Sequence, residues 1–237
     1  MSRQKMFSIT LCRTPKEQRV FERLPEVLHG SEPAFIPPFP GSVVKYLSPK
    51  SAFNRLSGEI YPFLAWRDGQ PVGRIAAILN RAHNEYYRDQ TGFFGFFDCE
   101  NNIELANALF KAAAEVLRSR DRESLRGPYN PSINDECGLL VEGFDHPPCL
   151  GLCWNPEYYK TLVEQLGFQS VCRSLGLHLP VHRLEVPERL SRIVKRIAKR
   201  STIRLRPINL SRLEEELKIV REVINATLQR NWGFVPI

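Results

Sequence analysis

The strongest constraint on the fold is a strand–turn–strand pattern in the first third of the chain. Residues 61–67 and 71–79 are rich in apolar, aromatic and β-branched side chains, and they flank Asp68-Gly69. An Asp-Gly pair between two such runs predicts a tight hairpin, because both turn residues must adopt positive φ. The chain is therefore expected to build an antiparallel sheet around these two strands.

A third strand is expected at residues 92–98, Gly-Phe-Phe-Gly-Phe-Phe-Asp. Phenylalanines on both sides of Gly95 predict that both faces are buried and that a β-bulge lies at the glycine. Shorter strands are predicted at residues 5–12, 124–127, 168–173 and 175–179, and a polar loop at residues 80–91.

Helices are predicted where a capping residue precedes an apolar stripe with helical period. The starts are Thr14 with Glu17 as a capping box, Asn101 or Asn102, and Asn155-Pro156-Glu157; the ends are near Gly30, Ser119 and Gly167. A single helical turn is expected at residues 42–47. Strands and helices in this order predict an α/β (α+β) sandwich, with a mixed, mostly antiparallel, twisted sheet and helices on both faces.

The net charge of +7 lies in one segment. Residues 1–182 carry 20 basic and 20 acidic side chains, residues 207–237 carry 4 of each, and residues 183–206 carry 9 basic side chains against 2 acidic ones. Within that segment, residues 187–199 predict a helix with one apolar face and one basic face. No apolar run approaches the ~18–20 residues of a membrane span, and the start of the chain lacks a signal-peptide core, so we expect a cytoplasmic protein.

The end of the chain repeats its beginning. A strand at residues 202–206, followed by a helix that Ser211 caps with Glu214 and that reaches about Gln229, matches the strand and helix near residue 6. So short a stretch cannot bury a core of its own. We therefore expect a domain of residues 1–182, a basic linker helix of residues 183–201, and in residues 202–237 the incomplete start of a second domain.

Metal binding is not expected. The six cysteines contain no C-x-x-C pair and are expected to be buried thiols. His146, Cys149 and Cys153 are three candidate ligands, but they lack a fourth partner and the spacing of a zinc ribbon. Small residues packed beside a proline-rich turn are the preferred interpretation of this cluster.

The order of elements resembles that of the GNAT superfamily of N-acetyltransferases. Residues 68–78 (DGQPVGRIAAI), the bulged strand at 93–98 and residues 162–168 (LVEQLGF) carry this resemblance, and residues 202–236 resemble the opening of a second such domain. An uncharacterised subfamily of tandem GNAT-like proteins is suggested by residues 92–97 (GFFGFF) and 127–138 (GPYNPSINDECG).

The resemblance implies acyl transfer from acetyl-CoA, as co-substrate, to an amine. In the family, backbone freed by the bulge pairs with pantetheine, and the next helix receives the pyrophosphate at its N-terminus. That places Phe97 and Asp98 at the expected cofactor site, while the aromatic side chains of the strand are expected in the core. The family's tyrosine, the acid that protonates the leaving thiolate, corresponds to Val163 here; Tyr159, one turn earlier, is the substitute or else a packed aromatic residue.

A second departure concerns the phosphate loop. Residues 98–104 (DCENNIE) contain three acids and no glycine, whereas the family has a glycine-rich loop there. The remaining candidate site is the loop of residues 129–137. In it, Asp135 and Glu136 are candidate bases for an amine, and Asn130 and Asn134 are candidate cofactor contacts. The alternative is a polar loop that satisfies its own backbone through Asx turns.

Two functions follow, and a third is weighed against them. The first is an acyl-CoA-dependent N-acyltransferase, acting on a small-molecule or peptide amine, whose first half is degenerate and whose intramolecular partner is the missing second domain. The second is a catalytically silent GNAT-like module with a binding or structural role. Nucleic-acid binding through residues 183–206 is not expected, because that segment has no interleaved aromatic residues.

Overall fold

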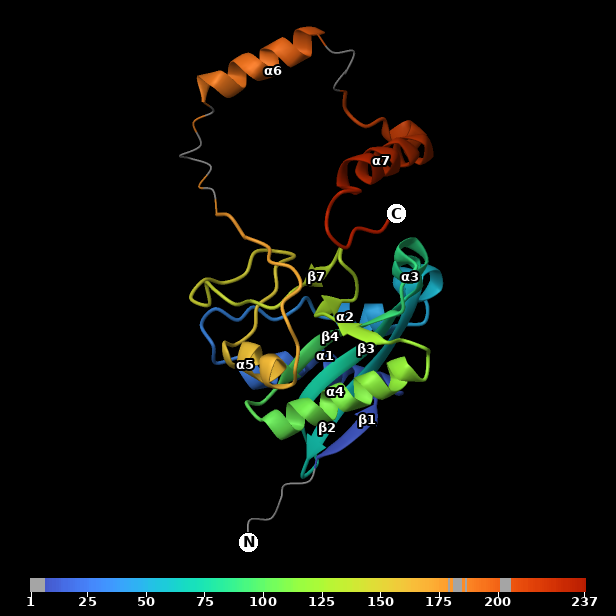
Figure 1. Cartoon of the computed structure of the whole chain (residues 1–237), viewed down its shortest axis with the longest axis vertical. Coiled ribbons are helices and arrows are strands. Elements are labelled where there is room, and N and C mark those ends of the chain that lie inside the picture. Colours follow the sequence, from blue (N-terminus) through green and yellow to red (C-terminus); the bar gives the residue numbers. More distant parts are fainter. Residues whose placement is uncertain (1–6, 179, 181–184, 186, 201–205) are drawn as a thin grey trace. The chain divides into compact units, whose positions relative to one another are not determined.

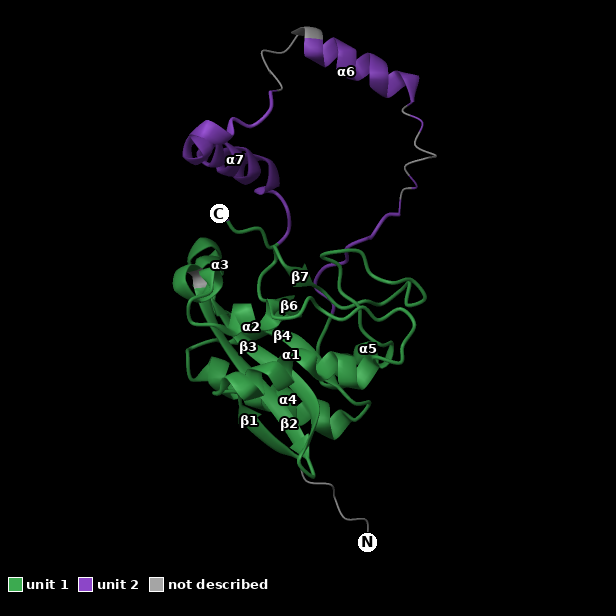
Figure 2. Cartoon of the chain, turned by 180° about the vertical axis from the view of Figure 1, so that it is seen from behind, with its two compact units in different colours: residues 1–169, 233–235 green, residues 170–232, 236–237 purple. Residues whose placement is uncertain are grey.

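The computed structural model describes residues 7–178, 180, 185, 187–200 and 206–237. The chain divides into two compact units, one of residues 1–169 with 233–235 and the other of residues 170–232 with 236–237 (Figure 2). The first unit contains the sheet and both hydrophobic clusters of buried residues. Each unit is described by itself.

The first unit is built on a five-stranded sheet (Figure 1). Its order along the sheet follows the chain: β1 (Ser8–Leu11), β2 (Gly58–Arg67), β3 (Gln70–Asn80), β4 (Thr91–Cys99) and β5 (Ser124–Arg126). The pairs are antiparallel except for β4 and β5, which run parallel. The sheet is therefore mixed and mostly antiparallel, as the sequence predicts.

The predicted hairpin joins β2 to β3. Arg67 pairs with Gln70 across the turn, and the two residues between them have positive φ, 51° at Asp68 and 77° at Gly69. Positive φ at both positions gives the turn a twist that matches the right-handed twist of the strands. The local sequence therefore fixes the register of the two longest strands.

The bulge predicted in β4 is confirmed, but it lies at Phe96 and Phe97, just after Gly95 rather than at the glycine. Arg74 of β3 lies opposite Asp98, but Ala76 lies opposite Gly95, so β4 has one extra residue there, and Phe96 has a φ of 50°. Because of this extra residue, Phe93 and Phe96 point to the same face, and the other two phenylalanines of the strand point to the opposite face.

Helices cover both faces of the sheet. On one face, α4 (Ile103–Arg118) and α5 (Tyr158–Gln165) close the larger core cluster, which includes Leu105, Leu109 and Phe97. On the other, α1 (Pro15–His29) and α2 (Ser42–Leu47) close the second cluster, which includes Phe21 and Phe96. A single π-helical turn, η1 (Phe53–Ser57), precedes β2.

Two of the helix starts are confirmed in atomic detail. The Oγ of Thr14 accepts the backbone N–H of Glu17 at 3.2 Å, and the Glu17 carboxylate accepts the backbone N–H of Thr14 at 2.8 Å. Asn102 caps α4 by accepting the N–H of Leu105 at 2.9 Å. These bonds satisfy donors that a helix N-terminus otherwise leaves unpaired.

Two other caps were predicted wrongly. Asn155 does not cap α5, because its amide pairs with both backbone groups of Leu140 instead. In the second unit Ser211 does not cap; Asn209 starts the short helix η3 (Leu210–Arg212), which leads into α7 (Leu213–Leu228). In the first case the predicted capping residue is engaged by the backbone of Leu140, and in the second Asn209 makes the capping bond instead.

Four further predictions were wrong or fall outside the described residues. Residues 80–91 are not a loop, because Asn80 caps a helix, α3 (Arg81–Tyr87). Residues 168–178 form no strand: a strand needs a hydrogen-bonded neighbour, and side chains such as Leu175 and Leu177 are exposed instead. The strand expected at residues 202–206 lies, except for Arg206, outside the described residues.

The second unit contains α6 (Glu188–Arg200) and α7. The helix predicted at residues 187–199 is thereby confirmed. Among the described residues, no helix is both long enough and apolar enough to cross a bilayer.

Candidate functional site

The bulge of β4 is covered by a short two-stranded ribbon. Its strands are β6 (Tyr129–Asn130) and β7 (Glu136–Cys137), and Asn130 pairs with Glu136. The backbone N–H of Phe96, which the bulge frees from the sheet, donates to Oδ1 of Asn130 at 2.6 Å. A Cβ at Gly95 would lie 1.6 Å from the carbonyl oxygen of Tyr129, so only glycine permits this close approach. The ribbon therefore occupies the backbone position that the GNAT resemblance assigns to pantetheine.

The loop between β6 and β7 is held by Asp135. Its carboxylate accepts the Tyr46 hydroxyl at 2.7 Å, the Ser132 hydroxyl at 2.6 Å and the Ser132 backbone N–H at 3.2 Å. Asn134 is exposed, and its backbone N–H donates to the same Ser132 hydroxyl at 3.2 Å. Side chains of the loop thus satisfy two of its backbone N–H groups, and the Asp135 carboxylate accepts three hydrogen bonds from two residues.

Glu136 is the carboxylate of this ribbon with a raised pKa. The residue as a whole is exposed, and partial burial of its carboxyl group is the main cause of the raised pKa. Asp135 raises the pKa further, while the Asn130 side chain and the Arg74 guanidinium act against the shift. A carboxylate with a raised pKa is a better proton acceptor near neutral pH than an ordinary one.

A second polar cluster lies at the end of β4. Asp98 accepts Nε of Arg74 at 2.7 Å and the Tyr159 hydroxyl at 3.2 Å. The Tyr159 hydroxyl also lies 2.9 Å from Nε2 of His29 and accepts the backbone N–H of Cys99 at 2.9 Å. We call Arg74, Asp98, His29 and Tyr159 the buried network; it ties α1, β3, β4 and α5 together.

The charges of the buried network are balanced internally. Burial alone would raise the pKa of Asp98, but the Arg74 guanidinium and the His29 ring lower it below its usual value. Burial, with the Asp98 charge second, raises the pKa of Tyr159 well above its usual value, so its hydroxyl keeps its proton. The Arg74 guanidinium also donates to the Phe21 carbonyl at 2.6 Å and lies 4.9 Å from the centre of the Phe21 ring.

The structure separates the predicted site residues into two groups. Asn130, Asn134, Asp135 and Glu136 are together in the ribbon and its loop, while Asp98 and Tyr159 are together in the buried network. Tyr159 is 1% exposed and Phe97 is 7% exposed, packed against Phe110 and Tyr159. Arg74 connects the two groups, because it pairs with Asp98 and its charge also acts to lower the pKa of Glu136.

Sequence reasoning missed His29 and Arg74. Arg74 had a signal, because an arginine inside an otherwise apolar strand must find a buried partner. His29 had none, since a histidine at a helix end commonly interacts with the helix carbonyl groups instead.

At the N-terminus of α4, where the GNAT resemblance implies the pyrophosphate, a side chain caps the helix and acidic residues lie nearby. Asn102 caps the helix, and Glu100 accepts Nη2 of Arg67 at 2.5 Å. Glu104 lies in the first turn. Negative side chains at this position oppose a pyrophosphate, as the sequence indicated.

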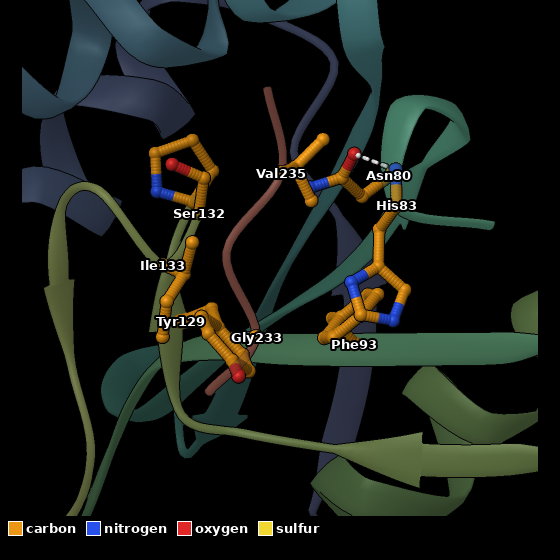
Figure 3. A pocket seen from close by; sticks show the side chains of 9 residues that line it. Asn80, His83, Phe93, Tyr129, Ser132, Ile133, Gly233 and Val235 are labelled. Carbon is orange, nitrogen blue, oxygen red and sulfur yellow. Dashed lines mark hydrogen bonds between the residues drawn. The ribbon is translucent and has the colours of Figure 1, made fainter. Parts of the chain in front are cut away.

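A pocket lies beside the ribbon (Figure 3). The nine residues that line it are Asn80, His83, Phe93, Tyr129, Pro131, Ser132, Ile133, Gly233 and Val235. Burial lowers the pKa of His83, partly offset by Asp89 at 3.3 Å. The Tyr87 hydroxyl donates to the carbonyl of Phe234 at 2.8 Å, which fixes residues 233–235 in the first unit.

No metal centre is found in the part of the chain that the structure describes, where no three His, Cys, Asp or Glu side chains come together as ligands. Cys149 is exposed and Cys153 is partly buried, so the expectation of buried thiols is wrong at Cys149.

The bulged β4, its parallel pairing with β5 and the helices on both faces define a GNAT-like α/β sandwich, the fold class that the sequence predicts. The chain is 35% identical over 219 residues to Protein YghO of Escherichia coli strain K12, covering 92% of this chain and 55% of that protein. It is 34% identical over 230 residues to the bacterial ceramide synthase of Caulobacter vibrioides, covering 97% of this chain and 59% of the synthase. The chain thus spans somewhat more than half the length of these curated relatives.

Two solved structures align with parts of this chain. A tandem GNAT protein from the clavulanic acid biosynthesis pathway aligns with 68% of this chain and 43% of its own, with a TM-score of 0.44 and 13% identity. An aminoglycoside acetyltransferase from a soil metagenome aligns with 73% of this chain and 94% of its own, with a TM-score of 0.40 and 13% identity. No protein-family model matches the chain.

Proposed function

We propose that this chain is part of an acyl-CoA-dependent N-acyltransferase that forms an amide on a long-chain amine. The observation that carries the proposal is the 34% identity, over 97% of this chain, to the bacterial ceramide synthase. A ceramide is the amide of a fatty acid with a long-chain amino alcohol. The GNAT-like sheet is consistent with that chemistry, since the resemblance implies transfer of an acyl group from a thioester to an amine.

In this proposal Glu136 is the base. An ammonium group must lose a proton before its nitrogen attacks a thioester carbonyl, and Glu136 has a raised pKa beside the bulge. Asn134 is exposed on the same loop and available to a substrate. Asp135 positions the loop through Tyr46 and Ser132. Tyr159 and Asp98 support β4 from the buried network, and acetyl-CoA is the simplest donor.

A second candidate, a catalytically silent module that supports another domain, is favoured by one observation. The Phe96 N–H that the bulge frees is already bonded to Asn130, and the end of α4 is capped and acidic. Both features stand where the GNAT resemblance expects the cofactor. In this alternative the unit of residues 1–169 with 233–235 binds no acyl-CoA.

Calorimetric titration of the chain with acetyl-CoA and with a medium-chain acyl-CoA separates the two candidates. Micromolar binding, with an amide product detected by mass spectrometry when a long-chain amino alcohol is added, is expected for the transferase. A Glu136→Gln variant should then keep binding and lose turnover, whereas an exposed control, Glu164→Gln, should keep both. Absence of binding to either thioester would exclude a cofactor site in this chain and leave the silent module.

A further inference from the structure

One face of α6 is apolar and exposed. Leu190, Ile193, Val194 and Ile197 recur at three- and four-residue intervals, so on a helix of about 100° per residue they form one stripe. Their exposed fractions are 51%, 44%, 60% and 54%. Four aliphatic side chains with this exposure form an apolar surface of the kind that binds a protein or a membrane.

The rest of α6 is basic. The helix sequence ERLSRIVKRIAKR carries six Lys and Arg residues against a single acid, Glu188. Helical geometry places Arg189 on one border of the stripe and Arg192 and Arg196 further round on the polar side. A narrow aliphatic stripe with cationic side chains along one border and on the opposite side of the helix is the pattern of helices that lie in the interface of an anionic bilayer.

The positive charge of α6 indicates which kind of partner binds the aliphatic stripe. A second helix of this chain, α7, also exposes aliphatic side chains, among them Leu217 and Ile219, but its sequence carries four acids against two basic residues. An apolar contact with a protein surface needs no excess of cations on the opposite side of the helix. Nucleic acid would use the cations but leave the aliphatic stripe uncovered, and α6 has no aromatic residue for stacking.

We propose that α6 is an interfacial helix that docks this chain on an anionic lipid surface, with its aliphatic stripe toward the acyl chains and its basic side chains among the headgroups. The stripe shares no residue with the bulge or the ribbon. The proposal does not depend on acyl transfer, and it holds equally for a silent module.

Co-sedimentation with lipid vesicles tests the proposal. The full chain is expected to pellet with vesicles of mixed phosphatidylcholine and phosphatidylglycerol and to stay in solution with phosphatidylcholine alone. Ile193→Asp, which places a charge in the stripe, should weaken binding by about tenfold or more. Ile219→Asp on α7 is the matched control, because the two isoleucines are 44% and 46% exposed; it should bind like the unmodified chain.

A further variant separates loss of the stripe from loss of the helix. Ile193→Ala keeps a strong helix former and removes only apolar surface, so it should weaken binding severalfold while circular dichroism stays unchanged. Absence of binding to the mixed vesicles, or equal binding by Ile193→Asp, would overturn the proposal. So would a dimer in sedimentation velocity that Ile193→Asp dissociates, because the stripe would then be covered by a second copy.

Discussion

Removing Arg74 should destabilise the protein far more than removing any exposed arginine. Arg74 is 5% exposed, lies 2.7 Å from the Asp98 carboxylate and donates to the Phe21 carbonyl. Arg74→Met keeps most of the volume but leaves Asp98 charged, enclosed and short of its main counter-ion. Deleting one partner of a buried pair costs about 3–5 kcal/mol, and we expect a loss of that size in the free energy of unfolding at pH 7.

The pH dependence should change sign with the same substitution. In the unmodified chain Asp98 has a lowered pKa, so its contribution to stability is complete above its unfolded pKa of about 3.9 and is lost as pH falls through the lower folded value. Without Arg74, burial raises the pKa of Asp98 above the unfolded value. That variant should therefore gain stability as pH falls from 7 toward 5, because protonation removes the unpaired charge.

Urea unfolding followed by circular dichroism between pH 5 and pH 8 measures both effects. Arg67→Met is the matched control, since Arg67 lies on the neighbouring strand and pairs with Glu100 at 2.5 Å, but both side chains are partly exposed. A pair of that kind contributes about 0–1 kcal/mol. If Arg74→Met costs no more than Arg67→Met, or if its stability does not rise toward pH 5, the reasoning about the buried network is refuted.

Three further predictions concern local features. Gly95→Ala should cost at least about 2 kcal/mol in urea unfolding and detach the ribbon, because its Cβ would overlap the Tyr129 carbonyl; a cost below about 0.5 kcal/mol would contradict the packing. Thr14→Ala should cost about 0.5–2 kcal/mol through loss of the capping box, measured in the same way, and an unchanged midpoint would argue against that bond in solution. Burial raises the pKa of Cys12 to about 12, so its thiol should resist iodoacetamide at pH 8 under conditions where exposed Cys149 reacts, and equal rates by peptide mass spectrometry would show that Cys12 is accessible.

The sequence predicted those parts of the fold whose cause is local. The Asp68-Gly69 turn, the Thr14 capping box and the β4 bulge depend on residues within a few positions of one another. The turn and the capping box are confirmed, and the bulge is confirmed immediately after Gly95. The strands predicted within residues 168–178 were wrong, because a local sequence pattern can suggest a strand but does not provide the neighbouring strand with which it must pair.

The candidate site was predictable only in part, for the same reason. The ribbon residues Asn130 and Glu136 are six positions apart, and their grouping follows from the loop itself. In the buried network His29 lies beside Tyr159, which is 130 positions away in the sequence, and no local sequence pattern predicts such a pair. Asn130 accepts the Phe96 N–H that the bulge frees from the sheet. This bond joins residues 34 positions apart, so only the three-dimensional structure reveals it.

The bulge has a consequence for how β4 is encoded. If Gly95 were deleted, Phe93, Phe94, Phe96 and Phe97 would alternate regularly, each on its present face, and Asp98 would still lie opposite Arg74. The core therefore does not need the extra residue. The ribbon does, since the deletion would place a phenylalanine side chain where the Tyr129 carbonyl now lies. Loss of a single codon would thus separate the scaffold from the candidate site, leaving a folded sheet from which the ribbon had been expelled.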